Sequence, residues 1–287
     1  MEKGLFLSNA HTHTNYCDGL NTPREMAEAA NRLGFVSLGF SGHGAQGFDP
    51  AYAMDGGRQE RYLRELRGLQ AEARNTPGAA RLWVGVEQDA TVPAALKAQN
   101  RMDFDYIIGC THYVCVDYKG GPVAADGYAP LLLDYVKEMY HGDMLAMVRY
   151  YYEAHTRMLA EDRPDIIGHF DLVRKAAECY GFYDAGDPAY RKLALSALEK
   201  ARAAGGVLEV NTGGVARGIM RNPYPSEELL RAWLEMGGQV TLTSDCHDAE
   251  KLDFGLDEAF SRLKALGCQS VLRLGTGSEL WEEVSCG

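Results

Sequence analysis

Short apolar runs that end in a histidine or a carboxylate recur along this chain, and they limit the folds it can adopt. The first run, residues 5–7, is expected to be a strand, and His11 and His13 follow it. Side chains two residues apart on an extended chain point the same way, so these imidazoles can face one metal ion. Asp18 adds a carboxylate nearby. A His-x-His pair alone is more often an ordinary polar strand end, so a metal site is inferred only because the pattern recurs.

Strands and helices are expected to alternate along the whole chain. Strands are predicted over residues 5–7, 35–40, 82–86, 103–109, 165–168, 207–210, 239–243 and 271–274. Amphipathic helices are predicted over residues 23–33, 58–73, 144–160, 188–204, 226–235 and 257–266. The first helix begins with a capping box formed by Thr22 and Glu25, with Pro23 at its first position. Residues 113–143 are expected to form an irregular segment that covers one end of the molecule.

This alternation predicts an α/β fold with a parallel sheet and crossover helices. The expected strands are almost continuously apolar, as in sheets whose two faces are both buried. An open doubly wound sheet is compatible with the alternation. A closed barrel fits better, because it brings the carboxyl ends of all strands, and the polar residues that follow them, to one mouth. The sequence contains no glycine-rich nucleotide-binding loop, internal repeat or low-complexity tract.

Charge and cysteine content disfavour several classes of function. With 287 residues and a formal net charge of -11, the chain has no general attraction to nucleic acid or to an anionic membrane. Its seven cysteines are scattered without a C-x-x-C pair, which favours a reducing compartment over a disulfide framework. His11 lies so near the first residue that no signal peptide is expected, and no apolar run has the length of a membrane span. A cytoplasmic location is therefore expected.

Six of the eight histidines belong to the recurring pattern, together with three carboxylates. The complete set is His11, His13, Asp18, His43, Glu87, His112, His169, Asp245 and His247. So many ligands exceed the needs of one tetrahedral ion and suit two or three ions that share a bridging carboxylate. The remaining histidines, His141 and His155, are expected to be solvated or locally hydrogen-bonded.

The motifs around these residues resemble those of the PHP (polymerase and histidinol phosphatase) superfamily. They are His11-Thr12-His13-Thr14, Asp18-Gly19, Ser41-Gly42-His43, Gly85-Val86-Glu87, Gly109-Cys110-Thr111-His112, Gly168-His169 and Ser244-Asp245-Cys246-His247. Within the superfamily, the chain resembles the stand-alone histidinol-phosphate phosphatases. The supporting segments are residues 104–109, 168–172, 209–214 and 224–226. The resemblance extends over essentially the whole chain, which is expected to be one metal-dependent phosphoesterase domain over residues 1–287.

The resemblance implies a distorted (β/α)7 barrel of the TIM-like type with a trinuclear site of iron, manganese or zinc. One ion would take His11, His13, Glu87 and Asp245. A second would take Glu87, His112 and His169, and a third would take Asp18, His43 and His247. Among these residues, Glu87, Asp245 and His247 are also expected to act in catalysis. Glu87 would bridge two ions, because a carboxylate has two ligating oxygens.

Two departures from the family pattern concern residues beside the expected ligands. Many relatives carry an acidic residue where this chain has Gly42, so His43 would lack a hydrogen-bond partner and the third ion would be held more weakly. Cys246 lies between Asp245 and His247, where a small residue is usual. On a strand it points away from them, and a buried structural thiol is expected.

The expected reaction is hydrolysis of a phosphomonoester, because metal ions can activate water at neutral pH and neutralise charge on phosphoryl oxygens. Arg217 is the preferred phosphate-binding residue, followed by Arg221 and Arg174. The resemblance implies L-histidinol phosphate as the substrate, with histidinol and phosphate as products of a step in histidine biosynthesis. The alternatives are another small phosphate or nucleotide, or a non-catalytic metal-binding PHP module. No nucleic acid or membrane partner is expected.

The expected substrate carries an ammonium group and an imidazole, which need an acidic or carbonyl group and a flat or polar wall. The irregular segment is the candidate for this wall. Its candidate residues are Asp117, Tyr118, Asp126 and Tyr128, for each of which a merely structural role is equally compatible with the sequence.

Overall fold

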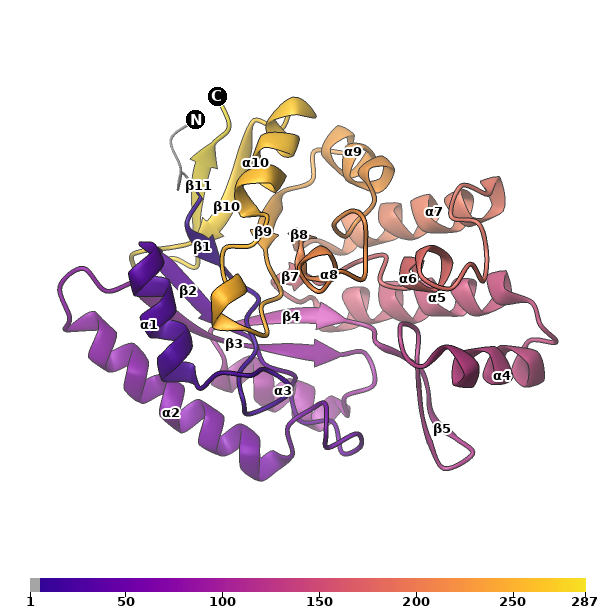
Figure 1. The fold of residues 1–287 in the computed structure, drawn as a ribbon, viewed down its shortest axis with the longest axis horizontal. Coiled ribbons are helices and arrows are strands. Elements are labelled where there is room, and N and C mark those ends of the chain that lie inside the picture. Colours follow the sequence, from indigo (N-terminus) through magenta and orange to yellow (C-terminus); the bar gives the residue numbers. More distant parts are fainter. Residues whose placement is uncertain (1–5) are drawn as a thin grey trace.

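The structure is a computed structural model, and it describes residues 6–287. Within this part of the chain, nine strands form one sheet (Figure 1). Their order is β1 (Ser8–Asn9), β2 (Ser37–Phe40), β3 (Arg81–Asp89), β4 (Tyr106–Cys110), β7 (Ile166–Ile167), β8 (Val207–Asn211), β9 (Val240–Thr243), β10 (Ser270–Leu274) and β11 (Trp281–Ser285). Neighbouring strands from β1 to β10 are parallel, and β11 is antiparallel to β10.

The segment after β1 pairs with the segment after β9, so the sheet is also joined between strands that are not neighbours in its order. Thr12 and Cys246 form an isolated parallel bridge. The amide of His13 donates to the Cys246 carbonyl at 2.8 Å, and the Cys246 amide donates to the His11 carbonyl at 3.0 Å. At the opposite end of β1, the Leu274 amide of β10 donates to the hydroxyl of Ser8 at 3.3 Å. The sheet therefore curves back on itself, with β10 beside the seam, which is the distorted barrel that the sequence and the resemblance predicted.

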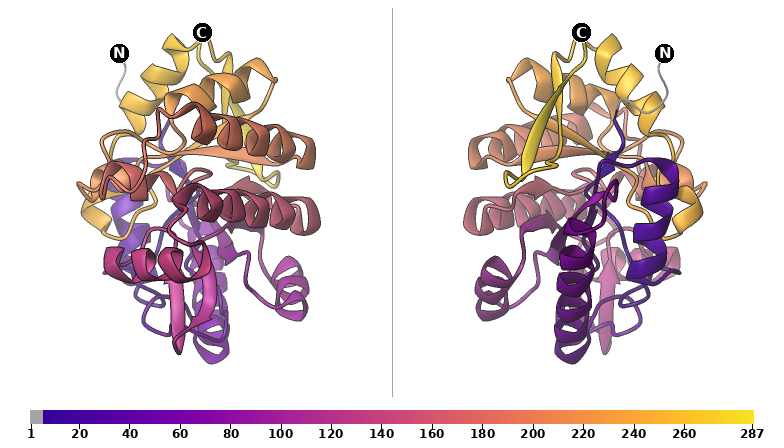
Figure 2. Two further views of the ribbon diagram at one scale, coloured as in Figure 1. Left: turned by 90° about the vertical axis from the view of Figure 1, so that its right-hand side faces the viewer. Right: turned by 90° about the vertical axis from the view of Figure 1, so that its left-hand side faces the viewer.

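The helices connect successive parallel strands and surround the sheet (Figure 2). They are α1 (Pro23–Leu33), α2 (Gly56–Arg74), α3 (Ala94–Asp103), α5 (Met144–Asp162), α7 (Pro188–Ala204), α9 (Glu227–Glu235) and α10 (Leu256–Ala265), with the short α6 (Arg174–Glu178), α8 (Gly213–Ala216) and η1 (Ala249–Lys251) between them. The predicted capping box is present at α1, where the Thr22 and Glu25 side chains each accept from the other's backbone amide. Among the described residues, no helix is long and apolar enough to cross a membrane.

Two predictions about local structure were wrong or incomplete, and some elements were not predicted. Of the strand expected over residues 5–7, Leu5 lies outside the described residues, and Phe6 and Leu7 precede β1. Residues 113–143 are not irregular. They form a hairpin of β5 (Tyr113–Tyr118) and β6 (Gly121–Ala124), followed by α4 (Ala129–Met139). The hairpin turns at Lys119 and Gly120, which both have positive φ. Of the two residues, only the glycine indicates that conformation in the sequence. Strand β11 and helix α3 were not predicted.

The inside of the barrel is filled by a small cluster of large side chains that includes Trp83, Tyr106 and Leu274. The hydroxyl of Tyr106 donates to the carbonyl of Ala10 at 2.5 Å. Gly85 pairs with Tyr106 across β3 and β4, and a Cβ at Gly85 would lie 2.4 Å from the Tyr106 ring. A side chain at Gly85 is therefore excluded by the ring that fills the barrel beneath the site.

Replacing Gly85 by alanine is expected to lower the free energy of unfolding by about 1–3 kcal/mol, because the new methyl group overlaps the Tyr106 ring. Urea or thermal unfolding measures this change. The matched control is Gly68→Ala on the exposed face of α2, where a Cβ meets nothing within 4 Å. The control is expected to be neutral or stabilising by up to about 1 kcal/mol. Equal unfolding midpoints for the two variants would contradict the tight packing described here.

Candidate functional site

The structure brings all nine residues of the predicted set together at the carboxyl ends of the strands. His11 and His13 follow β1 and are fully buried. The other seven line one cavity of about 180 Å³, and they are Asp18, His43, Glu87, His112, His169, Asp245 and His247. The parallel barrel creates this convergence, because each strand delivers its last residues to the same mouth.

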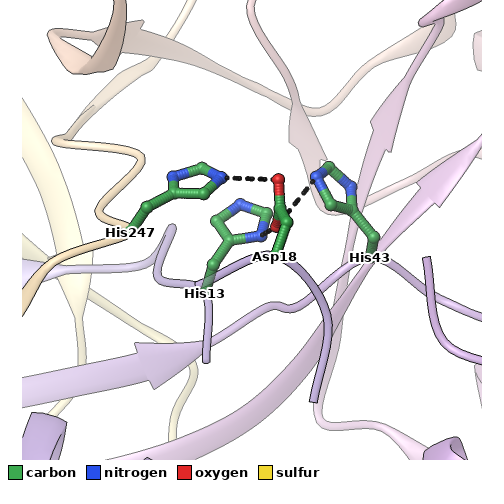
Figure 3. A group of neighbouring side chains, drawn as sticks. All are labelled: His13, Asp18, His43 and His247. Carbon is green, nitrogen blue, oxygen red and sulfur yellow. Dashed lines mark hydrogen bonds and ion pairs between the residues drawn. The ribbon is translucent and has the colours of Figure 1, made fainter. Parts of the chain in front are cut away.

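Three of these residues, His13, His43 and His247, surround the carboxylate of Asp18 (Figure 3). His247 Nε2 lies 3.2 Å from Asp18 Oδ2, whereas His13 Nδ1 and His43 Nε2 lie 3.4 and 3.7 Å from Oδ1. The ligand atoms of all four lie within 4.8 Å of one another. The resemblance implied only Asp18, His43 and His247 for this ion, and the structure adds His13 to the group.

His13 also belongs to a second group, with His11 and Asp245. His13 Nε2 lies 3.2 Å from Asp245 Oδ1, and His11 Nε2 lies 3.6 Å from the same oxygen. Neither Nε2 atom has a hydrogen-bond partner, although both residues are fully buried. Buried polar atoms are normally satisfied, so two unpartnered nitrogens aimed at one carboxylate indicate a position for a cation.

Glu87 lies between the imidazoles of the site. Its Oε2 lies 2.8 Å from His43 Nδ1 and 3.3 Å from His11 Nε2. Its Oε1 lies 2.9 Å from His169 Nε2 and 3.5 Å from His112 Nε2. The two oxygens thus face different imidazoles, which is the arrangement that a bridging carboxylate requires.

The electrostatics of the cluster favour added positive charge. At His11, burial lowers the pKa, but the surrounding carboxylates of Glu209, Asp245 and Glu87 raise it to about 10. At His43, burial dominates over the attraction of Glu87 and Asp18 and lowers the pKa to about 4. The site therefore contains more buried carboxylate charge than neutral imidazoles can balance. Protons or metal ions can supply the missing charge, and the donor set of imidazole and carboxylate suits first-row transition metals.

Two further carboxylates support the imidazoles and were not predicted as site residues. Glu209 is fully buried in β8, and its Oε2 accepts from His11 Nδ1 at 2.9 Å. Its Oε1 accepts the His169 amide at 2.5 Å. Asp89 Oδ2 lies 3.2 Å from His112 Nδ1. Each carboxylate fixes the ring so that Nε2 faces Glu87. Two features of the sequence could have identified them as site residues. Glu209 is a charged residue within an apolar strand, and Asp89 follows Glu87 by two residues.

Of the three predicted arginines, only Arg217 lines the cavity. Its Nη2 donates to Asp245 Oδ2 at 3.1 Å, and its side chain is 36% exposed. Arg174 is buried elsewhere, with its guanidinium bound to Asp171 and Glu178. Arg221 lies in a separate groove on the side of α10. Arg217 is therefore the one predicted arginine that can reach a molecule in this cavity.

The structure shows what surrounds Gly42 and Cys246, the two positions that depart from the family pattern. The Gly42 amide donates to the Tyr62 hydroxyl at 3.1 Å, and a Cβ at Gly42 would lie 3.0 Å from Cys17 Sγ. The thiol of Cys17 thus occupies the space that a side chain at position 42 would need. Cys246 is 2% exposed, and its thiol donates to the Asp248 carbonyl at 2.9 Å. The prediction of a buried structural thiol is confirmed.

The two histidines outside the set do not line the cavity. His155 is fully buried in α5, and its Nδ1 lies 3.0 Å from the hydroxyl of Thr111. Burial lowers the pKa of His155 to about 3. His141 lies in the turn between α4 and α5, with a φ of 53°. His155 is therefore not solvated, and its hydrogen bond joins it to a residue 44 positions earlier in the chain rather than to a local partner.

Comparisons with known proteins agree with this geometry. The sequence model of the PHP domain matches residues 9–213. A protein of Deinococcus radiodurans named "Probable histidinol-phosphatase" is 29% identical over 271 residues, which cover 92% of this chain and 95% of that protein. A Listeria monocytogenes structure, solved as a candidate histidinol phosphatase, has a TM-score of 0.73 at 17% identity and covers 87% of this chain and 98% of its own.

A second solved structure contains ligands. It is histidinol phosphate phosphatase from Lactococcus lactis, complexed with zinc, L-histidinol and phosphate. Its TM-score is 0.63 at 18% identity, and the match covers 93% of this chain and 96% of that chain. At these identities the two structures show a common fold.

Replacing Glu209 by glutamine is expected to weaken metal binding by about 10- to 100-fold, because the amide cannot accept from both His11 and the His169 amide as the carboxylate does. Competition with a chromophoric chelator measures the affinity, and unfolding of the metal-free protein separates it from a loss of stability. Glu199→Gln, on the exposed face of α7, is the matched control. Unchanged metal affinity in the Glu209 variant would refute the positioning role.

Proposed function

The chain belongs to the PHP domain family, and from that membership we propose that it is a metal-dependent phosphatase that hydrolyses L-histidinol phosphate to L-histidinol and phosphate. The observation that carries the proposal is the cavity in which imidazoles and carboxylates from six strand ends converge beside Arg217. The substrate is supported by the name of the Deinococcus relative and by the histidinol and phosphate in the Lactococcus structure. The reaction is a step of histidine biosynthesis.

The residues of the site fit a multinuclear centre of two or three zinc, manganese or iron ions. The Nε2 atoms of His11 and His13, and one oxygen each of Asp18 and Glu87, are buried without a hydrogen bond and support this fit. His11, His13, Glu87 and Asp245 would hold one ion, and Glu87, His112 and His169 a second. Asp18, His43 and His247, with His13 beside them, would hold a third. When bound, the ions supply a water-derived nucleophile at neutral pH and offset the charge of the phosphoryl oxygens.

The chain's own charges explain why the reaction would depend on metal. Asp18, Glu87 and Asp245 line the cavity and repel a phosphate dianion. Arg217 is the single arginine or lysine among the described residues that line it, and Asp245 already engages its guanidinium. Arg217 can nevertheless turn one N–H toward a phosphoryl oxygen, because a guanidinium has five donors in a fixed fork. Phosphate binding thus needs Arg217 and added cations together.

A small-molecule substrate agrees with the size of the cavity and with the formal net charge of -11, which disfavours nucleic acid as a substrate. The scattered cysteines support the cytoplasmic location of such an enzyme.

Replacing Glu87 by glutamine is expected to lower metal content and kcat/KM together, the latter by at least about 100-fold, because an amide cannot bridge two cations through two anionic oxygens. Elemental analysis and a phosphate-release assay measure the two effects. Glu60→Gln, on the exposed face of α2, is the matched control and is expected to change neither. A Glu87 variant with normal metal stoichiometry would refute the bridging role.

The substrate assignment is tested by comparing kcat/KM for L-histidinol phosphate, glycerol phosphate and a nucleoside monophosphate in the metal-loaded protein. Histidinol phosphate is expected to be preferred by about 100-fold, because only its amino and imidazole groups can add specific contacts to the shared phosphate. Equal kcat/KM values for the three substrates would indicate a phosphoesterase of another specificity. A metal-loaded protein without turnover of any of the three would indicate a non-catalytic metal-binding module.

A further inference from the structure

Asp126 differs from the other carboxylates that line the cavity. Asp18, Glu87 and Asp245 each lie within 3.7 Å of at least one imidazole nitrogen of the cluster. Asp126 makes no ion pair with these imidazoles, and it comes from the loop after β6 rather than from a barrel strand. It is therefore a carboxylate in the cavity that the proposed metal centre does not use.

A lysine outside the cavity lining holds Asp126 in place. Lys175 Nζ donates to Asp126 Oδ2 at 3.1 Å, and the two side chains are 15% and 26% exposed. Among the described residues, none donates a hydrogen bond to the other oxygen, Oδ1. Burial raises the pKa of Asp126, but Lys175 and the imidazoles of His112 and His169 lower it to below its ordinary value. The carboxylate remains charged and has one oxygen available to a ligand.

Arg217 and Asp126 give the cavity two charged groups of opposite sign outside the imidazole cluster. Arg217 comes from the segment after β8, beside Asp245. Asp126 comes from the segment after the β5–β6 hairpin, which is inserted between β4 and α5. A ligand with an anionic and a cationic end can satisfy both groups in one orientation only, whereas a plain phosphomonoester leaves Asp126 unused.

We infer that Asp126 is the residue that selects for a cationic substrate, by accepting a hydrogen bond from the substrate's ammonium group through Oδ1 while Lys175 holds Oδ2. This inference rests on the proposed function and adds to it the origin of the specificity. The hairpin insertion, through the loop that follows it, thereby supplies the discriminating group. The barrel strands supply the groups that bind any phosphate. Asp117, on the same hairpin, is exposed and has no part in this contact.

The test compares two substrates that differ only in the amino group, L-histidinol phosphate and 3-(imidazol-4-yl)propyl phosphate, in the metal-loaded enzyme. The wild type is expected to favour the aminated substrate by about 10- to 100-fold in kcat/KM, the range for a hydrogen bond to a charged group. Asp126→Asn is expected to abolish that preference by slowing the aminated substrate alone. If Asp126 only stabilised the fold, Asp126→Asn would lower kcat/KM equally for both substrates.

Asp117→Asn is the matched control, because it removes the same charge from the same insertion at an exposed position, and it is expected to keep the full preference. Asp126→Ala serves as a second variant, with metal content and unfolding midpoint as measures of an intact fold. A wild-type preference that persists in both Asp126 variants overturns the inference and leaves the proposed function standing. A wild type that hydrolyses histidinol phosphate no better than glycerol phosphate overturns the proposed function itself.

Discussion

The pairing of the chain beyond β1 with the chain beyond β9 is the contact on which the site depends. It joins the segment after β1 to the segment after β9 through the hydrogen bonds between His11, His13 and Cys246. The same backbone that closes the barrel places the imidazoles of His11 and His13 beside the carboxylate of Asp245. Alternate residues on these strand ends point into the mouth of the barrel. The contacts that close the barrel therefore also assemble the site.

Charge then determines what the assembled site can hold. Buried carboxylates are stable only when they are paired or neutralised, and here Glu87 and Glu209 lie wholly inside the protein. Glu209 contacts His11 on the side away from the cavity, and Glu87 contacts it on the other side. The imidazole is thus fixed between Glu209, which contacts its Nδ1, and Glu87, which faces its Nε2. Such a ring is already oriented for a cation, which reduces the reorganisation that binding requires.

The sequence predicted the parts of the fold that local chemistry determines. The capping box at Thr22 begins α1 as expected, and the polar residues after apolar runs converge at the barrel mouth. The β5–β6 hairpin was missed, because its turn requires positive φ at Lys119, a residue that rarely adopts it. Of the three arginines predicted to bind phosphate, the structure places only Arg217 in the cavity. Arg174 has acidic residues three positions before and four after it, and that local spacing already explained why it is bound elsewhere.

The sequence named Asp126 only as one of four candidates, because a pattern of strands cannot show which residue of an insertion faces the cavity. The position of Asp126 depends on an insertion whose two strands form a sheet separate from the barrel, and on Lys175, which is distant in sequence. This separation has a functional consequence. A change in the inserted loop can alter which end group of a substrate is recognised, while the imidazoles and Glu87 at the strand ends stay in place. In this chain, phosphate chemistry and substrate choice are therefore carried by structurally separate elements that meet in one cavity.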